Sequence, residues 1–309
     1  IAIATGAVTP LAGSGQAGST DATGTSAKFN YPDYVTMDDT NLYVGDTNNH
    51  LIRKIVISSG AVTTIAGSTS SGSTDGTGTS ASFNYPTGIT IDGSNLYVAD
   101  RNNHKIRKLD LTGTVTADVK LHNLDDDTDA VVSIASSNTG EGTVSPATLT
   151  FTEDNWNTAQ TVTVAGVNDT DRDRHQAYKI SLIAADQKID NPEVTTFAGS
   201  TSYGSTNATG TSARFKYPRG ITTDGTNLYV ADQSNHTIRK IVISTGVVST
   251  FAGSAGSYGS TDATGTSARF RNPKAITTDG TNLYVADSDN HKIRKIVIST
   301  GAVTTLAGS

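Results

Sequence analysis

The chain has 309 residues, 30 of them glycine, and a formal net charge of −6. It contains no cysteine, which excludes a disulfide framework and a thiolate metal site, and no apolar run approaches the roughly 18 residues that span a bilayer. Gly, Ser and Thr are abundant, and short Val-, Ile- and Tyr-rich segments alternate with turn residues without helical periodicity. This composition predicts an all-β protein.

The first residues repeat a segment that recurs along the chain. Residues 1–14 read "IAIATGAVTPLAGS", and residues 296–309 read "IVISTGAVTTLAGS". We expect the chain to open partway through a third strand and continue into a fourth, as a half-blade without inner strands. Two explanations stand: the chain is a window from a longer repeat array, or another copy completes the half-blade by self-association through terminal strands. The chain begins at Ile1 without a Met or a charged-then-apolar leader, so we expect that any signal peptide has been removed or lies outside this sequence.

Four complete units follow, each opened by a Phe with a Pro three residues later. The opening residues are Phe29, Phe83, Phe215 and Phe270, so the spacings are 54, 132 and 55. In the last unit, four strand-like runs read "KAITTD", "NLYVAD", "KIRKIVIS" and "AVTTLAG", separated by tight-turn residues. Four antiparallel strands at this period predict the blades of a β-propeller. The long second spacing indicates an insert in the second unit.

Each unit also carries an Asp, a His and an Arg at fixed offsets. The twelve residues are Asp46, His50, Arg53, Asp100, His104, Arg107, Asp232, His236, Arg239, Asp287, His291 and Arg294. A catalytic group needs an asymmetric surrounding, whereas these four triplets share one. We therefore predict structural fasteners: the Asp accepts N–H bonds in its turn, an Asn tightens that turn, the His packs beside the start of the next strand, and the Arg pairs with carboxylates on neighbouring blades.

The insert, residues 113–191, has a different composition from the rest. It holds thirteen acidic and five basic residues, a net charge of −8, against +2 for the remainder. Alternation in "ATLTFTE" and "AQTVTVAGV" predicts the half-buried strands of a small β-sandwich. The predicted domains are thus residues 1–112 and 192–309 for the propeller, and 113–191 for a sandwich between the third and fourth strands of the second blade.

Acidic loops of the insert are candidates for a Ca²⁺ site, since this ion takes six to eight oxygen ligands. The candidate ligands are Asp125, Asp127, Asp169, Asp171 and Asp173. The EF-hand pattern is absent, and a solvated acidic loop is the alternative.

The last two units are more basic than the first two around their opening Phe. The residues concerned are Arg214, Lys216, Arg219, Arg269, Arg271 and Lys274. With nearby tyrosines they predict a basic rim that binds a protein or an acidic polysaccharide, or pairs with the acidic insert; solvated loop charges are the alternative. The acidic balance of the whole chain disfavours sequence-independent nucleic-acid binding.

The pattern F-x-x-P-x-x-I-x-x-D-x-x-N-L-Y-V-A-D-x-x-N-H-x-I-R-K resembles the NHL repeat, and residues 49–51 spell Asn-His-Leu. The resemblance implies a β-propeller, most often of six blades, whereas four copies are present here. The insert resembles immunoglobulin-like or Calx-β-like modules of bacterial surface proteins, some of which bind calcium.

These observations predict a non-enzymatic protein, secreted or at the cell surface of bacterial type, that works in binding or structural assembly. The alternative is a metal-dependent lyase or lactonase of the NHL type, because related propellers include such enzymes. Four of the six histidines belong to the repeats, and the chain lacks G-x-S-x-G, H-E-x-x-H and phosphate-loop motifs.

Overall fold

The computed structural model describes residues 8–111, 114–119, 130–133, 142–151, 160–166 and 192–309. The chain divides into two compact units, one of Ile1–Asp110 with Asp190–Ser309 and one of Leu111–Ile189. Both divisions lie two residues before the boundaries expected from the sequence.

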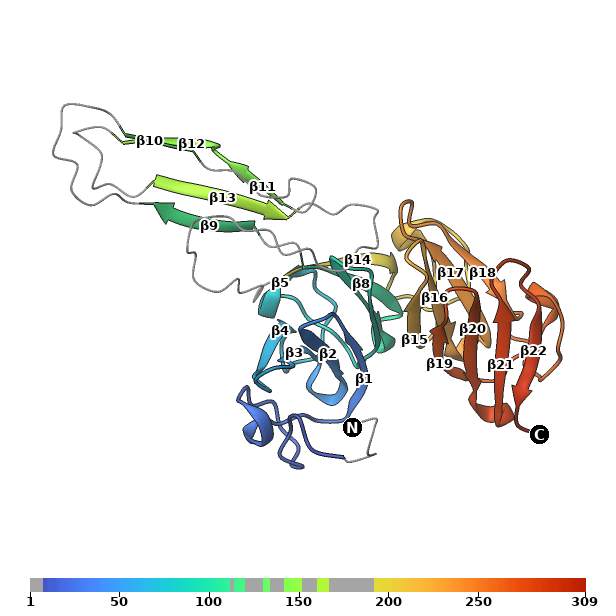
Figure 1. The fold of residues 1–309 in the computed structure, drawn as a ribbon. Coiled ribbons are helices and arrows are strands. Elements are labelled where there is room, and N and C mark those ends of the chain that lie inside the picture. The colour runs from blue at the N-terminus through green and yellow to red at the C-terminus, as the bar shows by residue number, and fades with distance from the viewer. Residues whose placement is uncertain (1–7, 112–113, 120–129, 134–141, 152–159, 167–191) are drawn as a thin grey trace. The chain divides into compact units, whose positions relative to one another are not determined.

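The first unit is a four-bladed β-propeller arrangement of antiparallel sheets, which confirms the predicted fold class (Figure 1). Its blades follow one another in chain order, and each inner strand packs beside the inner strand of the next blade. Blade 1 is β1 (Pro32–Met37), β2 (Asn41–Asp46), β3 (Leu51–Val56) and β4 (Val62–Gly67); blade 2 is β6 (Pro86–Ile91), β7 (Asn95–Asp100), β8 (Lys105–Asp110) and β14 (Glu193–Gly199), extended by the short β5 (Gly76–Thr77); blade 3 is β15 (Pro218–Thr223), β16 (Asn227–Asp232), β17 (Thr237–Val242) and β18 (Val248–Ala252); blade 4 is β19 (Pro273–Thr278), β20 (Asn282–Asp287), β21 (Lys292–Val297) and β22 (Val303–Ala307).

The second compact unit interrupts the chain between two paired strands of blade 2. Strand β14 pairs with β8 from Glu193 opposite Asp110 to Gly199 opposite Lys105. The second compact unit therefore leaves and rejoins blade 2 between its third and fourth strands.

Apolar side chains occupy both faces of the blades, because each blade packs against a neighbour on either side. Between blades 2 and 3, Tyr97 and Ile106 of one sheet meet Phe215, Ile221 and Leu228 of the other, all fully or almost fully buried. A matching cluster lies between blades 3 and 4. The core therefore consists of the interfaces between neighbouring blades, and we call each such interface a seam.

The expected half-blade has no fourth strand among the described residues. Residues 8–13 copy the outer strand β22 but carry no strand of their own, and residues 1–7 lie outside the described part. Pro10 corresponds to Thr64 of β4, whose N–H points away from β3 and donates to the Asp21 carboxylate. A proline cannot make the equivalent bond.

The second unit has two sheets in its described part. One pairs β10 (Ala130–Ser133) with β12 (Thr148–Phe151); the other orders β11 (Gly142–Ser145), β13 (Gln160–Gly166) and β9 (Thr114–Val119). Leu149 and Val162 are buried. These strands include the segments predicted from alternation, and the sandwich itself stays a prediction.

Helical structure in the described residues consists of three-residue 3₁₀ turns. None of these helices has the length and apolar character needed to cross a membrane.

Candidate functional site

A buried aspartate organises one edge of every blade. In blade 2, the Asp100 carboxylate accepts bonds from the Asn84 N–H, the Asn103 side-chain amide and the Arg107 guanidinium, each at 2.8 Å. Both charged side chains are fully buried. Burial raises the pKa of the Asp100 carboxyl against the opposing charge of Arg107, so this pair has a desolvation cost that its hydrogen bonds offset. The same three bonds are made by Asp46, Asp232 and Asp287.

The repeat arginine joins this carboxylate to the segment that leads into its blade. Arg107 lies opposite Val98 in the β7–β8 ladder, which makes it a diagonal neighbour of Asp100. Its other nitrogen donates to Asp75 at 2.8 Å, and its guanidinium lies over the Phe83 ring, 4.9 Å from the centroid. In each unit the guanidinium of the repeat Arg therefore packs on the ring of the opening Phe.

The expectation that these arginines reach neighbouring blades is wrong. They pair with the Asp of their own blade and with a residue of the incoming segment, because the hairpin register already places the two charges together. The second partners are Asp21, Asp75, Asn207 and Asp262.

The repeat histidine makes the contact between blades. A 3₁₀ turn, η4 (Arg101–Asn103), ends at His104 with a left-handed φ of 58°. His104 Nδ1 accepts the Tyr217 N–H of blade 3 at 3.1 Å, and the two rings meet edge to face. His50 and His236 make the same bond to Tyr85 and Asn272.

This bond requires an unprotonated Nδ1. Burial lowers the pKa of His50, His104 and His236, and the charge of Lys216 lowers that of His104 further. The seams are thus built around neutral imidazoles.

A second Asp in each unit escaped the sequence reasoning, although the pattern D-x-x-N-L-Y repeats it. The tyrosine hydroxyl of β7, Tyr97, donates to Asp92 at 3.0 Å, and the Asn95 N–H donates to the same carboxylate. Equivalent bonds from Asn282 hold the pKa of Asp279 well below its usual value. This Asp closes the turn between the first and second strands.

Cations and tyrosines gather at the same blade edge as the histidines. Lys216 lies 5.4 Å from the Tyr203 ring centroid, Arg271 lies 5.3 Å from that of Tyr258, and both tyrosines are about two-thirds exposed. Arg101, which the sequence did not single out, lies over Tyr217 at 5.6 Å. We call this set the cation–tyrosine edge: Arg101, Tyr203, Lys216, Tyr217, Tyr258 and Arg271.

The other members of the predicted basic rim are held differently. Arg214 donates to three carbonyls of its own turn, residues 211–213, and Arg269 donates to two carbonyls of the equivalent turn. Arg219 pairs with Asp33 at 3.0 Å. The carbonyl of Lys274 accepts the Tyr34 hydroxyl, whose pKa burial raises to about 12. Of the predicted rim, Lys216 and Arg271 therefore stand against exposed rings.

The seam between blades 1 and 2 lacks this pairing. Ser71 stands where the later seams have Tyr203 and Tyr258, and Asn84 stands where they have Lys216 and Arg271. The cation–tyrosine edge is thus a feature of blades 2 to 4.

The predicted calcium ligands Asp125, Asp127, Asp169, Asp171 and Asp173 lie outside the described residues. Within the part of the chain that is described, no three His, Asp or Glu side chains form a group that could hold a metal ion.

Comparison with known proteins supports the repeat assignment. A family model described as "NHL repeat" matches residues 83–109, within blade 2. The chain is 28% identical to NHL repeat-containing protein 2 of Gallus gallus and of Homo sapiens, over 90% of its own length and 40% of theirs. It is 25% identical to the chloroplastic protein SUPPRESSOR OF QUENCHING 1 of Arabidopsis thaliana, over 92% of this chain and 26% of that protein. The chain thus spans two fifths or less of these relatives.

Among solved structures, the chain is similar to an auxiliary nutrient binding protein from Bacteroides thetaiotaomicron, with a TM-score of 0.33, 16% identity, and coverage of 90% of this chain and 70% of the other. It is also similar to a streptogramin B lyase, with a TM-score of 0.36, 12% identity, and coverage of 89% and 67%. The chain is a four-bladed propeller arrangement that carries an NHL repeat at residues 83–109 and is similar, over nine tenths of its length, to NHL repeat-containing proteins.

Proposed function

We propose that this chain is a non-enzymatic binding scaffold, secreted or at a bacterial cell surface, whose cation–tyrosine edge binds an acidic polysaccharide. The observation that carries the proposal is the pairing of exposed tyrosine rings with Lys216 and Arg271 at two successive seams. The resemblance of the insert to surface modules supports the location.

The chemistry of the edge fits a charged sugar chain. Sugar rings pack their apolar faces on aromatic side chains, while carboxylate or sulfate groups pair with Lys and Arg. Two equivalent stations on adjacent seams match a ligand that is itself a repeat of one charged unit. Because each station has one cation beside its tyrosine ring, the affinity should come from several weak contacts in parallel.

Calorimetric titration of the chain with dextran sulfate, and with unsulfated dextran as the matched neutral polymer, tests this proposal. We expect binding of the sulfated polymer alone, weakened by added salt. The double variant Lys216→Asn and Arg271→Asn, which installs the residue that blade 2 has at this place, should bind about 5- to 30-fold more weakly if each exposed contact is worth about 0.5–1 kcal/mol.

Lys295→Asn, in the middle of β21, is the control. It removes one positive charge outside the cation–tyrosine edge and should leave the affinity for dextran sulfate nearly unchanged. Equal binding by the double variant and the wild type would contradict the proposal, and preferential binding of polyglutamate would favour an acidic protein as partner. Shortened polymer after prolonged incubation would favour the lyase alternative.

A further inference from the structure

Two arginines at the seam between blades 2 and 3, Arg101 and Arg219, have no arginine counterpart in another blade. Arg101 directly follows the repeat Asp of blade 2, and Arg219 directly follows the Pro that begins β15. The other blades place Thr47, Gln233 and Ser288 at the first position, and Asp33, Thr87 and Lys274 at the second. A blade therefore forms without an arginine at either place, and these two arginines do not belong to the repeated fastener.

The Arg101 guanidinium is positioned by an aromatic ring and not by a carboxylate. It lies over the Tyr217 ring of blade 3, 5.6 Å from the centroid, and the same ring meets His104 edge to face. Within the described residues Arg101 makes no ion pair and donates no hydrogen bond, and its Nε is buried without a partner. This half-buried charge therefore keeps its two Nη groups for a partner from outside the chain.

Arg219 is fixed through its backbone and has one carboxylate partner. Its carbonyl accepts the Thr87 hydroxyl of blade 2 at 3.1 Å, so the inner strands of two blades hold it. Its Nη2 donates to Asp33 at 3.0 Å, and its Nε is buried without a partner. The Asp33 carboxylate thus uses one nitrogen of a guanidinium whose fork matches both oxygens of an acidic group.

The charges of Arg101, Arg219 and Asp33 do not balance. Burial lowers the pKa of Arg101, the charge of Arg219 lowers it further, and Asp33 raises it, so the three groups lie within electrostatic range of one another. Two positive charges share one negative charge, and both arginine side chains are half-buried. A second acidic group would relieve the repulsion between the guanidiniums and accept bonds from donors that no protein group uses.

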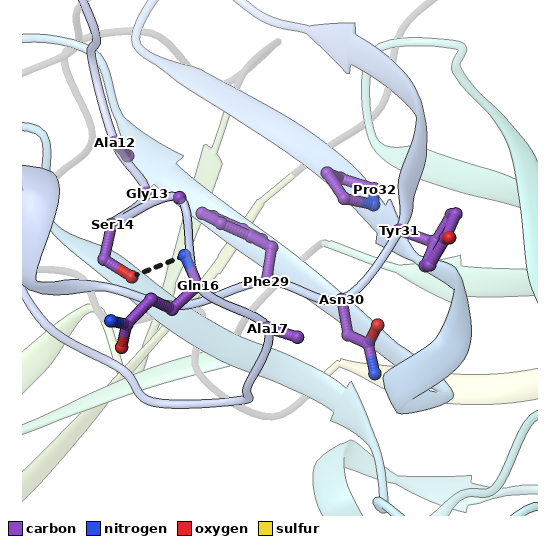
Figure 2. A pocket seen from close by; sticks show the side chains of 10 residues that line it. Ala12, Gly13, Ser14, Gln16, Ala17, Phe29, Asn30, Tyr31 and Pro32 are labelled. Atoms are coloured by element: carbon purple, nitrogen blue, oxygen red, sulfur yellow. Dashed lines mark hydrogen bonds between the residues drawn. The ribbon is translucent and has the colours of Figure 1, made fainter.

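A pocket of about 430 Å³ beside the start of blade 1 does not suit an acidic ligand (Figure 2). It is lined by residues 12–17 and 29–32, and none of these carries a charge. Its polar side chains include Ser14, whose hydroxyl already accepts the Gln16 N–H. The two arginines therefore match an acidic ligand better than this pocket does.

We propose that Arg101 and Arg219 form a binding site for one monoanionic oxyanion group, a carboxylate or a sulfate ester, of a small organic ligand. The acidic group bridges the Nη donors of the two guanidiniums, because a guanidinium fork matches the paired oxygens of such a group. The site shares Arg101 and Tyr217 with the cation–tyrosine edge. It takes a single acidic group instead of a polymer, so it does not depend on the polysaccharide binding proposed above.

Ligand-observed NMR titration of the 309-residue chain at constant ionic strength tests the site. The probes are glucuronate for the carboxylate, glucose 6-sulfate for the sulfate ester, and glucose as the matched neutral sugar. We expect saturable binding of at least one anion and none of glucose, and the tighter anion identifies the acidic group. Arg101→Gln and Arg219→Thr, which install the residues of blades 3 and 2, should each weaken this binding about tenfold or more by removing charge-assisted hydrogen bonds.

Two further variants test the assigned geometry. Lys240→Gln, in the middle of β17, removes one positive charge outside the site and should bind the anion like the wild type. Asp33→Asn removes the competing carboxylate of Arg219 and should bind the anion about two- to fivefold more tightly, as expected for the loss of a partly exposed ion pair.

Both arginine variants carry a side chain that another blade accepts at the same place, so they should melt like the wild type. Either one tests the site if the other does not fold. The proposal would be overturned by a wild type that binds neither anion, by equal binding of glucose, by an arginine variant with wild-type affinity, or by Asp33→Asn binding no more tightly. Binding of dextran sulfate is measured separately, so failure of this site and failure of the polysaccharide proposal give different results.

Discussion

At the scale of single residues, the repeat arginine is a fully buried charge with several partners. Arg107 is fully buried, held by two aspartates and stacked on Phe83, while its Nε has no hydrogen-bond partner. The other three copies share every one of these properties except the acidic second partner in blade 3, where Asn207 replaces it. The arginine therefore depends on one buried carboxylate for most of its compensation.

Removing that carboxylate should be far more damaging than removing the exposed one. We expect Asp100→Ala to lower the free energy of unfolding by about 3–5 kcal/mol, because it leaves the buried Arg107 charge with the half-exposed Asp75 as its charged partner. Asp75→Ala, which removes the half-exposed partner of the same guanidinium, should cost about 0–1 kcal/mol. Urea denaturation of both variants measures the difference; similar costs would show that the buried pair has no special weight.

At the scale of the element, the blade seams make stability depend on pH. The pKa of His50, His104 and His236 is lowered by burial, below the value of about 6.5 in an unfolded chain. Lys216 and Arg271 oppose protonation of His236, while Asp289 favours it. The unfolded state consequently binds protons that the folded seams exclude.

The sign of the effect follows from linkage. The stabilisation is fully present above about pH 6.5 and is lost as the pH falls through this value, by up to about 1.4 kcal/mol per pH unit for each histidine. His104→Asn keeps an acceptor and suits the left-handed backbone, so its loss of stability between pH 7.5 and 5.5 should be smaller than that of the wild type. Urea denaturation of both proteins at both pH values measures how much unfolding free energy each protein loses. An equal loss in the variant and the wild type would refute the explanation.

At the scale of the whole molecule, the insert is separable from the propeller. In blade 4 the four residues 298–301 lie between Val297 and Ala302, which are joined by the bond from the Val297 N–H to the Ala302 carbonyl. The Gly301 carbonyl in this turn accepts the Gly265 N–H. In blade 2 the Pro192 carbonyl accepts the equivalent bond from Gly78. A short turn can therefore supply the contacts that the end of the insert makes with its blade.

We expect that replacing residues 111–192 by Ile-Ser-Thr-Gly, the sequence of residues 298–301, leaves the propeller's melting temperature within about 2–4 °C, a change worth about 1 kcal/mol. The Asp110–Glu193 end of the ladder then closes like the other blades. Calorimetry of the shortened chain is the measurement. A loss of cooperative melting would mean that the insert helps to hold blade 2 together.

The sequence by itself determined the four blades of this chain and the four strands of each, because these follow from a pattern that repeats within one unit. It also predicted that Asn103 tightens the turn at Asp100, three residues before it, and their side chains bond. The prediction that Asp100 accepts N–H bonds from its own turn is wrong, because the N–H it accepts is that of Asn84, sixteen residues earlier. The tertiary structure decided the rest. It turned Arg107 back to its own blade through the hairpin register, and it brought Arg101 onto Tyr217 of the next blade.

The histidine shows the physical reason for this division. The bond joins residues of two different blades, 35 apart at the first seam and, across the insert, 113 apart at the second, so it forms only when the blades stack. It exists because stacked sheets bury their faces against one another, and because Gly199, which has no side chain, lets the His104 turn lie close to Phe215 of the next blade.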